Sequence, residues 1–536
     1  MKTDQGFTGR EAQVEEAPVE QALQNGWANP HRKRTTSRTV RVTSYVIMSL
    51  LLFVFFVPLP VHFDCLHHKF VPTRLRSFED RAKHILRHNP LIDGHNDLAI
   101  WIRANHGNHI NNESFSKPFA EGGLDGHVDI PRLQNGLNGG AFWSVFWPCP
   151  ANGTDYSDEN YHSAIQGTFQ QIDVLARLQA AHPSVFSPPT LTSREALHRF
   201  RWHHQFEHPL HDHLDDEEDH DFEDDDNDHD DDARPHHRHP QHPHHPRHRH
   251  SLHALGPLIS PLGVEGLHQI GNSPSILRQY HALGVRYATL THNCGNRFAD
   301  AALWEHPFRV AEPVWHGVSP EGRRLIREMN RIGMIVDLAH TSQDTMRDVL
   351  GGSVEEKGWE GSAAPVIFSH SSAYAVCPHP RNVPDDVLDL VGKRGGVVMV
   401  NFNGGFISCV EAAEGGSGIP EFEPKNSTLA QVVKHVLYIG ERIGFDHVGL
   451  GSDFDGIQDV PEGLEDVSKF PDLVVELLKH GVRDEDVAKI VGGNVLRVWG
   501  EVEAVAKKLQ KAGEPAMEDT LSGRLWGNLL DDVEEL

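Results

Sequence analysis

Short runs of β-branched and other apolar residues alternate with segments of helical periodicity through most of the chain. This alternation is typical of parallel sheets, because a helix carries the chain back to the starting edge of the next strand. Eight strands are expected, at 90–94, 141–147, 258–265, 287–292, 334–340, 365–370, 396–402 and 447–454. Eight strands close a (β/α)8 TIM-like barrel, so the predicted fold class is α/β.

The segments between these strands have the pattern of helices. In 322–332, apolar residues recur at helical spacing, and Gly333 follows as a stop signal. The segment 429–443 repeats this pattern before Gly444.

Histidines and carboxylates gather at the carboxyl ends of the predicted strands, where barrel enzymes place their chemistry. A single histidine at such a position is usually structural, but six of the eight ends carry candidates. They are His95 and Asp97, Glu265, His292, His340, His370 and Asp453. This concentration predicts a metal site.

The donor types indicate which ion the site holds. Imidazole and carboxylate without thiolate suit zinc or a similar divalent ion in a catalytic role. The donors are too many for one tetrahedral ion, and Glu265 lies on a strand where it can bridge two. Such a pair generates hydroxide at neutral pH and polarises a carbonyl. The sequence therefore predicts a barrel of the metal-dependent hydrolase type.

The chain is acidic, with 76 Asp and Glu against 49 Lys and Arg and a net charge of −27, which excludes nucleic acid as a partner. Residues 203–253 alone carry −12 and 16 of the 40 histidines. With no apolar periodicity, this insertion is expected to be disordered, on the face of the barrel opposite the active site. It is either an inert solvated loop, a weak sink for zinc or copper, or a pH-sensitive segment.

An apolar segment at 42–63 contains no Asp, Glu, Lys or Arg. As a helix its 22 residues extend roughly 33 Å, enough to cross a bilayer core. The basic residues before it place 1–41 in the cytosol as a disordered tail. We therefore expect a type II single-pass membrane protein with residues 64–536 in the secretory lumen or outside the cell. A cleaved signal peptide is the alternative, but the polar head is long and no small-x-small cleavage site follows.

Two other features agree with a secretory location. Glycosylation sequons begin at Asn112, Asn152 and Asn426. Of the five cysteines, Cys65 adjoins the apolar segment, and four follow it: Cys149, Cys294, Cys377 and Cys409. Four cysteines allow three pairings, and their spacing does not choose among them.

From about residue 77 to 505, the sequence resembles the membrane dipeptidases, also called renal or microsomal dipeptidases. The resemblance rests on specific runs: LIDGHND at 91–97, GVEG at 263–266, TLTHNC at 289–294, VDLAH at 336–340, PVIFSHSSAY at 365–374, RNVPDD at 381–386 and GSDFDG at 451–456. It implies an amidohydrolase-like barrel and two zinc ions per chain. His95 and Asp97 would bind one ion, His340 and His370 the other, and Glu265 would bridge them.

The resemblance also implies roles for three residues around the substrate. His292 would stabilise the oxyanion, and Asp453 would act as general base and then general acid. Arg381 would bind the free C-terminal carboxylate of a dipeptide. The family's disulfides imply the pairs Cys149 with Cys294 and Cys377 with Cys409. Cys65 is then left to pair between chains in a homodimer or to carry a lipid.

The function expected is a membrane-anchored zinc dipeptidase that hydrolyses short dipeptides through a metal-bridging hydroxide and tolerates a D-residue at the C-terminal position. One alternative is a related amidohydrolase acting on Cys-Gly conjugates, a β-lactam or a secondary-metabolite intermediate. Another is a non-enzymatic zinc-binding surface protein. Arg381 discriminates between the enzymes, because it predicts dependence on a free carboxylate.

Overall fold

Eight parallel strands form the central sheet in the order β1-β2-β3-β4-β7-β8-β9-β12, which is also their order in the sequence. The computed structural model describes residues 77–206, 257–352, 358–411 and 416–520, all in the second of two units that divide at Leu75. The strands are β1 Leu91–Asn96, β2 Asn138–Val145, β3 Leu262–Glu265, β4 Val285–Thr289, β7 Ile335–Asp337, β8 Ile367–Phe368, β9 Val397–Val400 and β12 Val448–Leu450. All eight predicted strands are present.

Backbone contacts between β1 and β12 close the sheet. Asn96 and Phe454 form an isolated parallel bridge. The Asp97 N–H donates to the Phe454 carbonyl at 2.9 Å, and the Asp453 N–H donates to the His95 carbonyl at 3.0 Å. These contacts confirm the predicted (β/α)8 barrel.

A buried carboxylate reinforces this closure. Oδ1 of Asp93 accepts a hydrogen bond from the Ser452 N–H at 2.7 Å, and its Oδ2 accepts one from the Ser452 hydroxyl at 2.5 Å. Burial raises the pKa of Asp93 to about 6. The hydrogen bonds between Asp93 and Ser452 thus join the first and last strands next to residues that are predicted to form the site.

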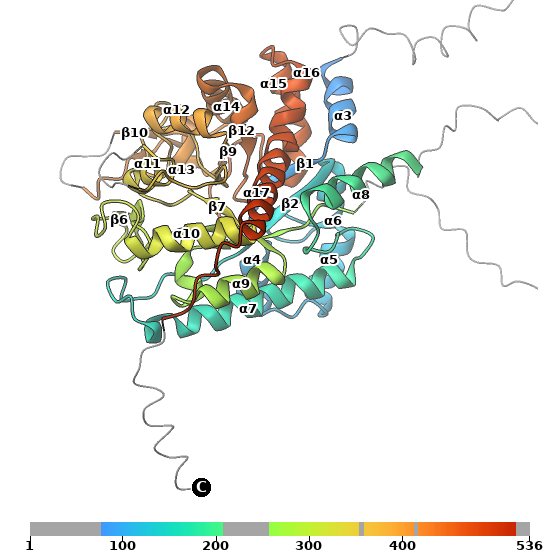
Figure 1. Ribbon diagram of the computed structural model, residues 1–536. Helices are drawn as coiled ribbons and strands as arrows, with labels where there is room; N and C mark the ends of the chain where they lie inside the picture. Colours follow the sequence, from blue (N-terminus) through green and yellow to red (C-terminus); the bar gives the residue numbers. More distant parts are fainter. Residues whose placement is uncertain (1–76, 207–256, 353–357, 412–415, 521–536) are drawn as a thin grey trace, which may run out of the picture. The chain divides into compact units, whose positions relative to one another are not determined.

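Helices surround the strands (Figure 1). They are α3 Phe78–His88, α4 Leu98–His106, α5 Glu113–Glu121, α6 Ile130–Asn135, α7 Asp158–Ala181, α8 Ser193–Phe206, α9 Pro274–Ala282, α10 Pro320–Ile332, α11 Gln343–Val349, α12 Asp385–Arg394, α13 Gly404–Ile407, α14 Leu429–Ile443, α15 Phe470–Lys479, α16 Asp484–Ala488 and α17 Asn494–Lys511. Short 3₁₀ helices are η2 Leu267–Ile270, η3 Pro424–Asn426, η4 Phe445–His447 and η5 Val467–Lys469, and η6 Lys489–Gly493 is a π-helical segment.

Helix α10 shows why the chain alternates as predicted. The Ser319 hydroxyl caps its first turn by accepting from the Gly322 N–H at 2.9 Å. Gly333 ends it with φ 86°, a conformation that glycine adopts without a Cβ penalty. Helix α14 ends before Gly444 as expected.

The interior of the barrel is filled with apolar side chains, and α8 and α17 cover it at the end where the strands begin. This cluster includes Ile92, Phe142, Ile335, Ile367, Val397 and Met399 from the strands, Ala196 and Phe200 from α8, and Val495, Val498, Trp499 and Val502 from α17. Several of these are the first residues of their strands. The opposite end is left for polar side chains.

Six of the eight strands end earlier than predicted, and in four of them the difference moves a site residue out of the strand. The strands expected to include His292, His340, His370 and Asp453 stop two or three residues before them. At His340 and Asp453 the backbone has φ of 63° and 65°, the left-handed region, which an extended strand cannot contain. These four functional candidates therefore lie in the first residues of the loops.

Several predictions fall outside the described residues, among them the apolar segment 42–63, the tail 1–41, Cys65 and most of the insertion 203–253. No helix in the described ranges is long and apolar enough to cross a membrane. Helix α8 runs to Phe206, past the predicted start of the insertion at 203, since no glycine or proline interrupts it before Pro209. The insertion thus follows α8 and precedes β3, as expected from the sequence.

His435 of α14 anchors two loops at the carboxyl end of the barrel. Its Nδ1 accepts from the Ala373 N–H at 3.0 Å, and its Nε2 donates to the Ile407 carbonyl at 2.9 Å. The ring is fully buried, and burial lowers its pKa to about 4.

The fold should therefore lose stability in acid through His435. A histidine whose folded pKa is depressed stabilises the fold above its unfolded pKa of 6.5, and this stability is lost as the pH falls toward 4. The difference corresponds to about 3 kcal/mol. Between pH 6.5 and 4, the free energy of unfolding of the wild type, measured by denaturant titration, should fall by about 3 kcal/mol more than that of His435→Leu. Parallel pH curves for the two proteins would contradict the assignment.

Candidate active site

Four imidazole rings surround one carboxylate oxygen. Oε1 of Glu265 lies 2.9 Å from Nε2 of His340, 3.4 Å from Nε2 of His370, 3.7 Å from Nε2 of His95 and 3.9 Å from Nε2 of His292. All five side chains are buried. Residues that lie far apart in the sequence therefore meet at one point.

The barrel topology explains this convergence. Glu265 is the last residue of β3, His95 lies in β1, and the other three histidines follow the ends of β4, β7 and β8. Parallel strands of a closed barrel end on one face, so their terminal side chains point at a common centre. Every metal ligand predicted from the sequence lies there, including Asp97, whose Oδ2 is 3.1 Å from Nε2 of His95.

Two of the rings are held through Nδ1, the nitrogen that faces away from Glu265. Nδ1 of His340 lies 2.9 Å from Oδ1 of Asn293, and Nδ1 of His95 lies 2.7 Å from the Tyr287 hydroxyl. The Asn293 oxygen can only accept, so His340 carries its proton on Nδ1 and directs the Nε2 lone pair toward Glu265. Gly263 makes room for the Tyr287 ring, since a Cβ there would lie 2.1 Å from it.

The third ring is held through a serine. Nδ1 of His370 lies 2.8 Å from Oγ of Ser369, and this hydroxyl donates to Oδ2 of Asp337 at 2.6 Å. Since the serine proton is directed to the carboxylate, its oxygen accepts from Nδ1 of His370. This ring also presents an Nε2 lone pair to the centre.

These donors fit a pair of divalent cations. His95, Asp97 and Glu265 form one group, and Glu265, His340 and His370 form another, with ligand atoms within 4.8 Å of one another in each group. Nε2 of His340 and Nε2 of His370 are only 3.0 Å apart, an approach of two lone pairs that a shared cation would stabilise. Oδ1 of Asp97 is buried without a hydrogen-bond partner among the described residues. The two groups share Glu265, the residue predicted to bridge.

Asp453 lies at the edge of this centre. Asn401 donates to its Oδ2 at 2.9 Å and fixes the carboxylate. Burial raises the pKa of Asp453 to about 7, and the negative charges of Asp97 and Glu265 add to this, while His95 opposes it. A carboxyl group with such a pKa can both accept and donate a proton near neutral pH.

His292 and Arg381 also line the site. Burial lowers the pKa of His292 well below its ordinary value, so the ring is neutral. Arg381 is 1% exposed, and its guanidinium lies 5.0 Å from the centre of the Phe406 ring. Its Nε has no hydrogen-bond partner among the described residues, and its Nη2 makes only a long contact of 3.5 Å with the His370 carbonyl. A buried cation held so weakly has room for an anionic partner.

These groups border one cavity of about 600 Å³. Two hairpins form much of its apolar wall: β5 Leu303–Trp304 with β6 Arg309–Val310, and β10 Cys409–Val410 with β11 Glu421–Phe422. They meet where the Val310 N–H donates to the Ser417 carbonyl at 3.1 Å. The apolar lining residues are Ile100, Phe146, Leu303, Phe308, Phe406, Ile419, Pro420, Phe422 and Ile457.

Two disulfides connect the loops around this cavity. Cys149 is bonded to Cys294, and Cys377 to Cys409, which is the pairing implied by the family resemblance. The first bond joins the loops after β2 and β4, and the second joins those after β8 and β9.

Sequence reasoning assigned no role to the residues that hold the rings and the general base, namely Tyr287, Asn293, Ser369, Asp337 and Asn401. Asn293 and Ser369 adjoin predicted site histidines, which is a signal that could have found them. Tyr287 is separated by 192 positions from His95, and nothing in the sequence links the two.

A closed (β/α)8 barrel with imidazoles and carboxylates at its carboxyl end defines the class of TIM-barrel metal-dependent hydrolases. Comparisons with known proteins agree. The sequence profile of the membrane dipeptidases, peptidase family M19, matches residues 79–206 and 243–513. The chain belongs to this family of metallopeptidases.

The chain is 40% identical to the dipeptidase aclJ of Aspergillus oryzae over 425 residues, which cover 79% of this chain and 81% of aclJ. It is 41% identical to an uncharacterized dipeptidase of Schizosaccharomyces pombe over 445 residues, or 82% and 87% of the two chains. A metallo peptidase from Rhodobacter sphaeroides, solved with a phosphinate mimic of L-Ala-D-Ala, has the same fold at 21% identity. Its TM-score is 0.53, and the match covers 77% of this chain and 99% of that one.

The serine that holds His370 should contribute to metal affinity. Replacing a group that orients a ligand lowers the affinity by roughly 10–100-fold. We expect a loss of this size for Ser369→Ala, measured by competition with a chromophoric chelator. Ser184→Ala, at an exposed position, is the control. Equal affinities of the two variants would contradict the role of Ser369.

Proposed function

We propose that this protein is a zinc-dependent dipeptidase that hydrolyses the peptide bond of short dipeptides. His95 and Asp97 would hold one zinc ion, His340 and His370 the other, and Glu265 would bridge both. The observation that carries the proposal is that the two ligand groups share Glu265, and that Glu265, Asp97 and His340 line one cavity together with Asp453, His292 and a weakly held Arg381. When bound, the ions supply a Lewis acid for the carbonyl and lower the pKa of water.

The two residues beside the metal donors have the properties that peptide hydrolysis requires. Asp453, held by Asn401, accepts the proton of the attacking water and returns it to the leaving amine. His292 is neutral and buried, so its Nε2–H can donate to the oxyanion without introducing a second cation. Both lie in the wall of the cavity that holds Glu265.

Arg381 accounts for a requirement for a free carboxylate next to the cleaved bond. A guanidinium binds a carboxylate through two parallel hydrogen bonds. Pairing with the C-terminal carboxylate of the substrate would neutralise the buried charge and place the adjacent peptide bond at the metal donors. A substrate with a blocked C-terminal carboxylate would lack this partner, and the family resemblance extends the proposal to a D-residue there.

The apolar wall favours a second candidate within the same chemistry. A cavity of about 600 Å³ with nine apolar lining residues exceeds the needs of a small dipeptide. It suits a substrate with a bulky apolar group, such as an S-conjugate of Cys-Gly or a secondary-metabolite intermediate. Hydrolysis of a β-lactam is the remaining alternative from the sequence.

The topology predicted from the sequence stays a proposal: an anchor at 42–63 with the barrel in the secretory lumen or outside the cell. Exposure of the sequon residues supports it, because Asn112, Asn152 and Asn426 are all exposed and accessible to glycosylation. Mass analysis of the secreted or membrane-bound protein before and after glycosidase treatment tests this.

The first test of the activity removes the bridging carboxylate. In the presence of zinc, the full-length protein should hydrolyse Gly-D-Ala or Cys-Gly, and a chelator should stop the reaction. Glu265→Gln should lower kcat/KM by more than about 100-fold, because a ligand contributes more than the groups that orient it. Glu159→Gln, on an exposed position of α7, is the control. Full activity of Glu265→Gln would contradict the proposed mechanism.

The second test pairs Arg381 with the substrate carboxylate. A charged hydrogen-bonded pair contributes roughly 1.5–3 kcal/mol, or up to about 150-fold. With a dipeptide that has a free C-terminal carboxylate, Arg381→Gln should have a kcat/KM lower than that of the wild type by up to this factor. The wild type should show the same decrease when the dipeptide is C-amidated. For Arg381→Gln assayed with the C-amidated dipeptide, kcat/KM should be little lower than for either change alone, because both changes remove the same interaction. Additive losses would contradict direct contact, and Arg309→Gln, on the hairpin at the cavity, is the control.

A further inference from the structure

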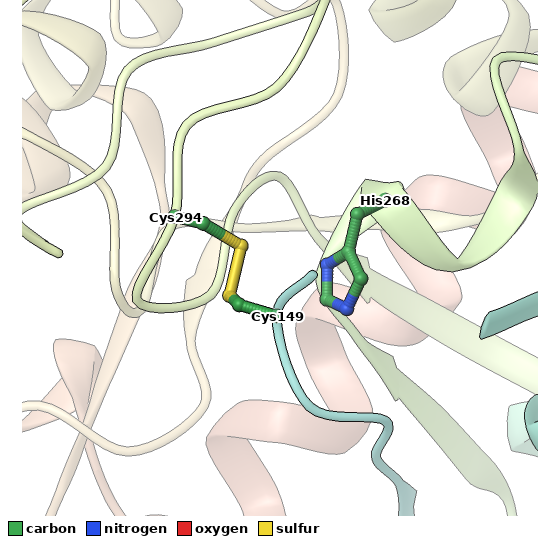
Figure 2. Close-up of side chains that lie close together, drawn as sticks. All are labelled: Cys149, His268 and Cys294. Atoms are coloured by element: carbon green, nitrogen blue, oxygen red, sulfur yellow. A yellow bond between two sulfur atoms is a disulfide. The ribbon is translucent and has the colours of Figure 1, made fainter. Parts of the chain in front are cut away.

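A second cluster of potential metal ligands lies outside the groups that share Glu265. The Cys149–Cys294 disulfide packs against His268 of η2, and Figure 2 shows a ring nitrogen of His268 facing the sulfur atoms. One ligand atom from each of the three residues lies within 4.8 Å of the other two. All three side chains are buried, with 7%, 2% and 1% exposed for Cys149, Cys294 and His268.

His268 has an unused lone pair in this cluster. Its Nε2 lies 2.8 Å from the Trp147 carbonyl, which can only accept, so Nε2 carries the proton. Nδ1 is therefore an acceptor, and it has no hydrogen-bond partner among the described residues. Burial lowers the pKa of the ring to about 4, so it stays neutral. A disulfide offers no proton to this nitrogen, and a buried acceptor left unpaired is unfavourable.

We propose that Cys149, Cys294 and His268 form a second metal site, for a thiophilic divalent ion such as Zn²⁺, when the disulfide is reduced. A dithiol reductant supplies two electrons and two protons, the S–S bond breaks, and the reductant leaves as a disulfide. Binding the ion then releases the two thiol protons. Two thiolates and a neutral imidazole around a divalent cation carry no net charge, which suits a buried site.

The surroundings provide room for this coordination. The Cα atoms of the two cysteines are 6.1 Å apart. Sulfur atoms bound to one zinc ion lie roughly 3.8 Å apart, given Zn–S bonds of about 2.3 Å in tetrahedral geometry. A small cavity of about 10 Å³ borders both cysteines together with Trp304, Glu305 and His306, and it can admit about one water as the fourth ligand.

The proposed site adjoins His292. Sγ of Cys149 lies 3.7 Å from Nδ1 of His292. A Cβ on Gly266 would lie 2.6 Å from Nδ1 of His268 and 3.2 Å from Cβ of His292, so the two histidines flank this glycine closely. Separation of the sulfur atoms would therefore change the packing of His292. The site itself needs none of the proposed catalytic residues and stands independently of the dipeptidase proposal.

The test uses the full-length chain with Cys65→Ser, Cys377→Ser and Cys409→Ser, in which Cys149 and Cys294 are the only cysteines. The protein is reduced with dithiothreitol, freed of it without oxygen and titrated with Cd²⁺, whose thiolate complexes absorb in the ultraviolet. The donors around Glu265 include no thiolate, so they add nothing to this absorption. We expect one equivalent of Cd²⁺ to produce the band in the reduced protein and to protect both thiols from alkylation, with no band in the oxidised protein.

His268→Ala should weaken this binding by at least about tenfold, through loss of a ligand, whereas His281→Ala, a half-buried histidine elsewhere, should leave it unchanged. Absence of the band, or equal affinity in His268→Ala and the parent, would overturn the proposal. Loss of the near-ultraviolet circular dichroism on reduction that Cd²⁺ does not restore would overturn it as well, because the site requires the folded loops.

Discussion

The structure depends on one buried negative charge and the groups that surround it. The Glu265 carboxylate is withdrawn from water at the end of β3, and burial raises its pKa. Removing a carboxylate from water costs several kcal/mol unless partners compensate. Here four imidazoles, which lie in or directly after four other strands, come within 4 Å of the same oxygen. His340 and His370 present lone pairs to it, so the compensating charge would come from the proposed metal ions. The (β/α)8 topology is what makes such a convergence available, because it places eight strand ends on one rim.

Closure of the barrel and formation of the site use the same residues. Asp93 and Ser452 join the first strand to the last, while Asp97 and Asp453, which follow in the same two segments, line the cavity. The apolar cluster at the opposite end, which includes Trp499 of α17, stabilises the barrel, and Tyr287 of this cluster reaches the site through its hydroxyl. Polar and apolar functions are thus separated along the barrel axis, which leaves the polar end free to hold strained backbone such as that of His340.

The sequence predicted the eight strands and the residues around Glu265, because periodicity and strand-end motifs are local signals. The pairing of the two disulfides was implied only by the family resemblance, since spacing alone left three pairings open. The sequence missed the contacts between distant segments. Tyr287 reaches His95 only because Gly263 has no side chain, and the apolar wall forms only where two hairpins meet at Val310 and Ser417. Asp453 has a left-handed backbone conformation, so β12 ends earlier than the sequence pattern predicts. Such features depend on tertiary packing, which single-sequence patterns do not contain.

The hydrogen bonds between Asp93 and Ser452 have a consequence for synthesis of the protein. The two residues are separated by 359 positions, so the ribosome must complete nearly the whole barrel before the first strand finds its last neighbour. Until β12 and the residues after it are synthesised, Asp453 is missing from the surroundings of His95, and the edge of β1 that contacts β12 has no partner. A chain that terminates before β12 should have neither a closed sheet nor a complete site, and fragments of this protein should have no partial activity.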